Sequence, residues 1–212
     1  MMAGIFISLE GPDGAGKTTQ LNLLAEHLKK RGFIVRCTRE PGGTAIGDKI
    51  RALLLDPAHG EMAARTEALL YMAARAQHVA EVIAPALARG EAVLSDRYAD
   101  STIVYQGAAR RLAMAELTAT NLFATGGVMP ALTILLDGDG DLLGGRRVGR
   151  GSADRIEDEG EPFQKLVRQG FRELAAAEPE RIRTVAAAGS VAEVHRQVVA
   201  VVEEFLYRRG LG

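Results

Sequence analysis

The sequence predicts an α/β fold in which a five-stranded parallel sheet is flanked by helices. Short apolar runs alternate along the chain with longer segments whose apolar residues recur at helical spacing. The runs are almost continuously apolar, as in strands that are covered on both faces. Because strand, helix and strand follow one another repeatedly, we expect parallel pairing through crossover helices.

Each element follows from its own pattern. The expected strands are residues 5–9, 33–37, 92–95 and 132–137, with a weaker fifth at 181–187. The expected helices are residues 17–31, 46–55, 63 to about 84, 115–124, 162–177 and 190–208. Pro85, Pro130 and Pro179 lie at or near the ends of such segments, which fits the inability of proline to continue a helix.

Length and composition suit one globular domain, residues 1–212. The formal net charge of -1 gives no overall attraction to nucleic acid or to an anionic membrane, so a bound anion needs a local site. The chain shows neither a signal-peptide pattern nor an apolar run near the roughly 20 residues that span a bilayer, which predicts a cytoplasmic protein. The single cysteine, Cys37, excludes an internal disulfide, and its apolar neighbours predict a buried thiol.

A phosphate-binding loop is expected between the first strand and the first helix. Residues 11–18, GPDGAGKT, match the pattern G-x-x-x-x-G-K-[ST]. Glycines let backbone amides curl around an anion, and the helix N-terminus adds a positive dipole. Lys17 is expected to reach the β- and γ-phosphates of ATP, and the Thr18 hydroxyl to hold Mg²⁺. The expected nucleotide site comprises Gly11, Pro12, Asp13, Gly14, Ala15, Gly16, Lys17, Thr18 and Thr19, and it predicts a three-layer P-loop NTPase fold.

Asp13 is unexpected in such a loop, because a carboxylate repels a polyphosphate. It could be a solvated turn residue. The alternative is that it faces a second ligand and accepts a hydrogen bond from a neutral hydroxyl, which predicts a second substrate beside the triphosphate.

Three further clusters suit that second substrate. Residues 38–44 and 95–107 follow the second and third strands, at the sheet edge where open α/β proteins bind ligands. Within the latter, Asp96 offers a carboxylate to the metal region and Arg97 offers a guanidinium to phosphate. In the third cluster Tyr71 and Arg75, four residues apart, share one helix face, which suits a flat heterocycle with carbonyl acceptors.

Together GPDGAGKTT, TREPGGT, DRYADSTIVYQG and GRGSADRIE resemble the thymidylate kinase family of the bacterial kind, over nearly the whole chain. The resemblance implies a nucleoside-monophosphate-kinase fold that uses ATP and Mg²⁺ to phosphorylate dTMP to dTDP, in dTTP biosynthesis, and a homodimer. The alternatives are a P-loop kinase for another deoxynucleotide or nucleoside acceptor, and a nucleotide-dependent switch. The switch is disfavoured because the sequence lacks the N-K-x-D motif of GTPases.

The resemblance also implies roles for individual residues. Toward the sugar and phosphates, it implies that Asp13 binds the deoxyribose 3′-hydroxyl, Tyr105 packs by the sugar, Arg39 and Arg97 engage phosphate, Glu40 orders the site, and Asp96 helps to place Mg²⁺. Toward the base, it implies that Arg51 lies near the thymine pocket, Tyr71 stacks, Arg75 donates to a carbonyl, and Thr102 and Gln106 read the base edge.

A lid of basic residues is implied at about 143–156. Gly14 stands where some relatives, chiefly eukaryotic, carry an arginine, so the resemblance assigns the missing charge to lid arginines. Arg150 and Arg155 are the candidates for catalysis, with Arg146 and Arg147 as further ones. Four glycines between 138 and 145 depart from the family pattern, and they predict a frayed or shortened helix leading into the lid.

Overall fold

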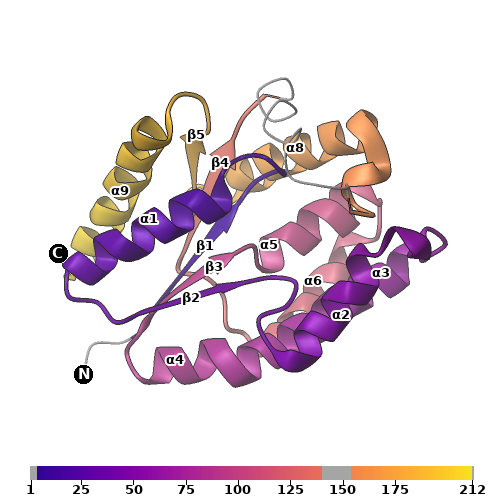
Figure 1. Cartoon of the computed structure of the whole chain (residues 1–212), viewed down its shortest axis with the longest axis horizontal. Helices are drawn as coiled ribbons and strands as arrows, with labels where there is room; N and C mark the ends of the chain where they lie inside the picture. The colour runs from indigo at the N-terminus through magenta and orange to yellow at the C-terminus, as the bar shows by residue number, and fades with distance from the viewer. Residues whose placement is uncertain (1–3, 140–153, 212) are drawn as a thin grey trace.

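The computed structural model describes residues 4–139 and 154–211, which form three layers with the sheet in the middle (Figure 1). The strands are β1 (Ile5–Glu10), β2 (Val35–Arg39), β3 (Ala92–Asp96), β4 (Leu132–Asp137) and β5 (Ile182–Ala186). All pair in parallel, in the order β2-β3-β1-β4-β5. The predicted α/β fold and its five strands are therefore confirmed.

The bounds of the helices agree with the predicted ones except around two π-helical segments. The α-helices are α1 (Lys17–Lys30), α2 (Ala45–Leu55), α3 (Ala64–His78), α4 (Ala84–Ala88), α5 (Ala99–Thr102), α6 (Met114–Thr125), α8 (Gly160–Ala177) and α9 (Val191–Arg208). Two segments, Val79–Ile83 and Ile103–Ala109, are π-helical, and Pro57–His59 and Glu157–Glu159 form short 3₁₀ turns.

The helix predicted to end near residue 84 instead continues to Ala88. A π-helical turn lies between α3 and α4, immediately before Pro85. Proline lacks an N–H and its ring needs room in the preceding turn, so a widened turn allows the helix to pass it.

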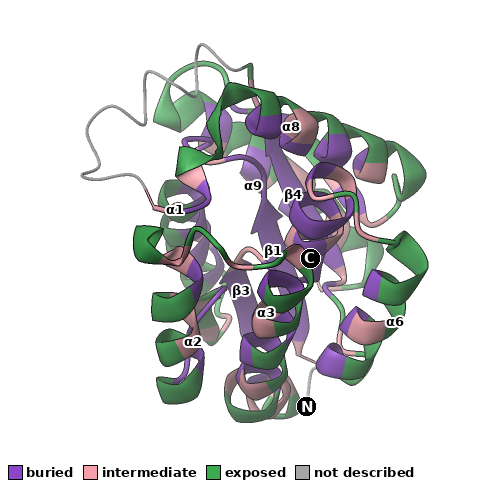
Figure 2. Cartoon of the chain, turned by 90° about the vertical axis from the view of Figure 1, so that its right-hand side faces the viewer, coloured by how far each residue is buried: buried purple, intermediate pink, exposed green. Residues whose placement is uncertain are grey.

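Both faces of the sheet are covered, because alternate strand residues point to opposite sides. Ile5, Ile7 and Leu9 of β1 belong to a core shared with α1 and α9. Phe6, between them, packs with Val79–Ile83 and α4 on the other face. Figure 2 shows the strands and inner helix surfaces buried and the outer helix surfaces exposed.

β2 lies at the sheet edge, and there two predictions were wrong, the bounds of the strand and the burial of Cys37. The strand begins at Val35 rather than at residue 33, after Gly32 closes α1 with a positive φ of 89°. With a strand neighbour on one side only, β2 is not continuously buried, and Cys37 is exposed rather than buried.

The carboxyl ends of β1, β3 and β2 bring their following loops to one edge of the sheet. Asp96 of β3 lies opposite Leu9 in the β1 register and opposite Arg39 in the β2 register. Loops that are distant in the sequence therefore converge there, as expected for an open parallel sheet. None of the helices within residues 4–139 and 154–211 is both long and apolar enough to cross a membrane.

Candidate active site

The loop after β1 has the conformation that its glycines permit. Gly11 has a φ of 136°, and a Cβ there would collide with the carbonyl oxygen of Leu136, so only glycine fits. Gly14 and Gly16 also have positive φ values, 87° and 88°, and Gly16 is the N-cap of α1. The loop therefore turns tightly into the helix N-terminus, the arrangement that binds phosphate.

Lys17 is held over this loop. Its Nζ donates to the carbonyl oxygens of Gly11, at 3.0 Å, and Pro12, at 2.9 Å. Burial, followed by repulsion from Arg97, lowers the pKa of Lys17 to about 8. The Asp13 carboxylate, 3.9 Å away, opposes this shift only in part, and a bound polyphosphate would add further negative charge beside the ammonium.

Thr18 and Asp96, the two predicted metal-binding residues, are in contact. The Thr18 hydroxyl donates to Asp96 Oδ2 at 2.5 Å. Hydroxyl and carboxylate oxygens are the ligands that Mg²⁺ prefers. The described residues contain no group of three or more His, Cys, Asp or Glu side chains that could hold a metal ion. A pair of oxygen ligands suits an ion that also takes ligands from phosphate and water.

Asp13 faces Arg97 and Tyr105. Arg97 donates to Asp13 Oδ1 at 2.6 Å and to the Tyr105 hydroxyl at 3.1 Å, and its guanidinium lies 5.1 Å from the centre of the Tyr105 ring. The hydroxyl of Tyr105 is 3.4 Å from the other Asp13 oxygen. The Asp13 carboxylate is thus compensated by an arginine on the neighbouring loop.

These groups open into one cavity of about 690 Å³. Of the predicted site residues, it is lined by Asp13, Gly14, Gly16, Lys17, Thr18, Arg39, Glu40, Arg51, Tyr71, Asp96, Arg97, Thr102, Tyr105 and Gln106. The loop expected to bind ATP phosphates and the residues expected around a second substrate therefore share a single cavity.

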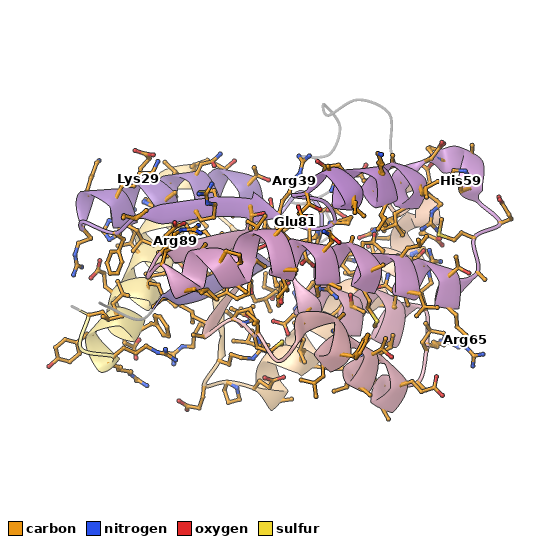
Figure 3. All side chains as sticks on the ribbon, turned by 90° about the horizontal axis from the view of Figure 1, so that it is seen from below. Lys29, Arg39, His59, Arg65, Glu81 and Arg89 are labelled. Atoms are coloured by element: carbon orange, nitrogen blue, oxygen red, sulfur yellow. The ribbon has the colours of Figure 1, made fainter. Side chains whose placement is uncertain are left out.

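Part of the cavity wall is strongly cationic. Arg39, at the end of β2 (Figure 3), lies close enough to Arg51 to affect its ionisation. Burial, then repulsion from Arg39, lowers the pKa of Arg51, and Arg97 adds to the effect. Arg51 donates to the carbonyl oxygen of Pro41 at 2.9 Å, which fixes its position. Three guanidinium groups near one another favour an anionic ligand.

Arg75 does not line the cavity, although Tyr71 on the preceding turn does. It is only 1% exposed. Its N–H groups donate to Glu40, Thr102, Asn121 and the Tyr98 carbonyl oxygen, at 2.6–3.1 Å. Arg75 therefore lies behind Thr102 and Glu40, which do face the cavity.

Arg155 is likewise buried away from the cavity lining. Its Nε donates to the Leu54 carbonyl oxygen at 2.8 Å, and its backbone N–H donates to Leu55 at 3.1 Å. It thereby joins the end of the expected lid to α2. Of lid residues 143–156, the structure describes 154–156, so Arg146, Arg147 and Arg150, and the expected fraying before the lid, lie outside the described residues.

Sequence reasoning missed several polar residues beneath the site. Glu10 is buried and accepts from the Tyr98 amide and the Ser101 hydroxyl, both at 2.7 Å. Burial, then repulsion from Asp100, raises its pKa to about 7. His78 contacts Glu40 Oε1 at 3.0 Å. Only its spacing of three residues from Arg75, on the same helix face, could have suggested this role.

Comparison with known proteins gives a consistent result. A family model described as thymidylate kinase matches residues 9–198. The thymidylate kinase of Symbiobacterium thermophilum is 48% identical over 208 residues, covering 98% of this chain and 97% of that protein. That of Deinococcus radiodurans is 49% identical over 204 residues, covering 96% and 98%. The crystal structure of thymidylate kinase from Ehrlichia chaffeensis has a TM-score of 0.77 at 31% identity, covering 95% of this chain and 99% of that one.

Proposed function

The chain belongs to the thymidylate kinase family, and we propose that it transfers the γ-phosphate of ATP to dTMP, giving ADP and dTDP for dTTP synthesis. The observation that carries this proposal is the shared cavity, which is lined both by Lys17 and Thr18 of the phosphate loop and by Tyr71 and Gln106 of the expected base site. Donor and acceptor would meet within it.

Phosphoryl transfer needs positioning and charge compensation more than covalent chemistry. An oxygen of the dTMP phosphate forms a bond to the γ-phosphorus, and the bond from that phosphorus to the bridging oxygen of ADP breaks. The attacking oxygen is already ionised, so no general base is required. Lys17, Arg39 and Arg97 would offset the repulsion between the two anions, together with Arg150 of the lid.

Mg²⁺ fits the oxygen pair formed by Thr18 and Asp96. When bound, the ion neutralises charge on the β- and γ-phosphates. Asp96, held by the Thr18 hydroxyl, would orient that site.

Recognition of dTMP is assigned to residues around the Asp13–Arg97 pair. Asp13 would accept a hydrogen bond from the 3′-hydroxyl, and Tyr105 would pack against the sugar. Tyr71 would stack on the base near Arg51, while Thr102 and Gln106 read its edge. Because all of its donors point to protein acceptors, Arg75 would act through Thr102 and Glu40, which it holds.

The proposed quaternary state is a homodimer. Helices α2, α3 and α6 lie side by side (Figure 1). Each of them exposes large apolar side chains. These are Ile46, Leu53, Leu69, Met114, Leu122 and Phe123, of which Phe123 is 88% exposed. Apolar side chains gathered on neighbouring helices favour association. Since both substrates are nucleotides, we also propose the cytoplasm as the working compartment.

The deciding experiment is an acceptor panel. ADP release is measured with Mg²⁺-ATP alone and with dTMP, dUMP, dCMP, AMP or thymidine. The proposal expects release that depends on the acceptor and is fastest with dTMP, with dTDP as the product. Equal release without any acceptor would favour a nucleotide switch, and a preference for a different acceptor would favour another kinase.

A further inference from the structure

Gln106 is held in one orientation by a carboxylate. Its Nε2 donates to Glu67 Oε1 at 2.8 Å. An ionised carboxylate has no hydrogen to donate, so the amide nitrogen, not the amide oxygen, must face Glu67. The backbone is fixed as well, because the Gln106 carbonyl oxygen accepts from the Leu112 amide at 3.1 Å. Gln106 itself lies in the π-helical segment Ile103–Ala109.

Glu67 is in turn immobilised on α3. It is fully buried, and Arg110 donates to both of its oxygens, at 3.2 and 3.1 Å. Arg155 lies 2.7 Å from Glu67 Oε2, an ion pair whose alignment falls short of a hydrogen bond. Burial opposes ionisation, but the bonds from Arg110 and Gln106 prevail and keep the pKa of Glu67 below its usual range. Glu67 therefore remains an acceptor only.

Because its nitrogen faces Glu67, the Gln106 amide presents its oxygen to the cavity. Gln106 lines the cavity, and no residue in the described part of the chain donates to its Oε1. With the nitrogen committed to Glu67, this oxygen is the acceptor that the side chain can offer to a ligand in the cavity.

Pyrimidine bases differ at the position where such an acceptor would act. Thymine and uracil carry a hydrogen on N3, between two carbonyl groups, whereas N3 of cytosine is a bare acceptor. A fixed carbonyl oxygen bonds to the first two bases and faces the cytosine lone pair without a bond. A site built to hydrogen-bond one partner rejects the partner that leaves it unpaired.

We propose that Glu67 is a specificity-determining positioning residue. By holding the amide nitrogen of Gln106, it presents the Gln106 oxygen to N3–H of the base and so excludes dCMP. The inference rests on the proposed dTMP kinase function and on Gln106 reading the base edge. Glu67, which does not line the cavity, would thus determine the choice between thymine and cytosine.

The test is Glu67→Gln, which replaces the pure acceptor by an amide that can both donate and accept. Gln106 can then turn and donate to N3 of cytosine. We expect the dTMP:dCMP ratio of kcat/KM to fall by about tenfold or more. The dTMP:dUMP ratio should stay unchanged, since both bases carry N3–H. A general loosening of the pocket would alter both ratios.

Two further variants show whether Glu67 acts through Gln106. Arg110→Lys keeps a positive charge beside Glu67, so that Glu67 stays ionised, and it leaves the Glu67–Gln106 bond; it should therefore leave both ratios unchanged. In a Gln106→Met background, the dTMP:dCMP ratio should already be low, and adding Glu67→Gln should lower it no further.

Three outcomes would overturn the inference. The dTMP:dCMP ratio could stay unchanged in folded Glu67→Gln, or both ratios could change in parallel. The third is a wild-type enzyme that accepts dCMP as readily as dTMP. Circular dichroism shows whether the Glu67→Gln protein is folded. If it is misfolded, the Gln106→Met variant provides the test, because an unchanged dTMP:dCMP ratio in that variant would also refute the inference. A wild-type enzyme with no dTMP turnover would instead refute the proposed function itself.

Discussion

Arg97 donates to Asp13 at 2.6 Å, joining two loops that are 84 residues apart in the sequence. The pair explains how an acidic residue can stand in a phosphate-binding loop, because its charge is offset before any substrate arrives. Arg97 also has a φ of 70°, in the left-handed region that most side chains avoid. That conformation costs about 1–2 kcal/mol, and strain of this kind is common where a side chain must be aimed at a ligand.

Replacing Arg97 by alanine should lower kcat by on the order of a hundredfold or more, because a preorganised cation is lost from the transferring phosphate. Steady-state kinetics with dTMP would measure it, and thermal unfolding would establish that the fold is retained. Arg97→Lys is the matched control: it keeps the charge but loses the guanidinium fork, so it should recover only part of the rate. Near-normal turnover in folded Arg97→Ala would refute the assigned role.

Asp13→Ala should weaken dTMP binding strongly and leave ATP binding nearly unchanged, because the carboxylate turns toward Arg97 and Tyr105. Calorimetric titration of each nucleotide separately would measure this. If both affinities fell equally, Asp13 would be serving the phosphate loop rather than the acceptor.

ATP affinity should decrease as the pH rises above about 8. The pKa of Lys17 is lowered to about 8 in the folded protein, from 10.5. Below pH 8 the charged Lys17 therefore lowers the free energy of unfolding. As the pH rises from 8 to 10.5 this destabilisation disappears, because Lys17 loses its proton in the folded protein first. Bound phosphate favours the charged form, so ATP should bind with uptake of a proton and lose affinity by up to roughly tenfold per pH unit above 8. Titrations at several pH values would show the slope, and Lys17→Arg, which stays charged, should abolish it.

Arg155→Ala should destabilise the protein by on the order of 2–4 kcal/mol, because it removes an ion pair from the buried Glu67 and a bond to Leu54. Denaturant unfolding would measure the loss. Arg183→Ala, which breaks a partly exposed pair with Glu204, should change stability by about 0.5 kcal/mol or less. Unaltered stability with a collapse of kcat would show that Arg155 reaches the phosphates instead of anchoring the lid.

Phe123→Asp should shift the protein from dimer to monomer, since a charge at the exposed apolar surface of α6 opposes association. Light scattering would report the change from twice the 22.6 kDa chain mass to that mass. Tyr207→Asp introduces the same charge at a 79% exposed residue of α9 and should leave the dimer intact. A monomeric wild-type protein would contradict the proposed assembly.

The sequence was sufficient for the features that depend on local spacing. Residues 11–18 identify the phosphate loop, because each fixed position serves a nearby backbone group or the helix that follows. The apolar runs predicted the five strands for a similar reason. Asp96 and Thr18 could be expected to lie close together because parallel strands deliver their following loops to one edge.

Other features depend on partners that are distant in the sequence, and only the tertiary structure decided them. The spacing of Tyr71 and Arg75 places both on one helix face. Arg75, however, donates hydrogen bonds to Glu40, Thr102 and Asn121, so of the two only Tyr71 lines the cavity. Burial of Cys37 depended on whether β2 had a second strand neighbour. The local pattern determines which residue types face a layer. The orientation of a charged or amide side chain depends instead on the few partners that satisfy its hydrogen bonds. Those partners are brought together only when the chain folds.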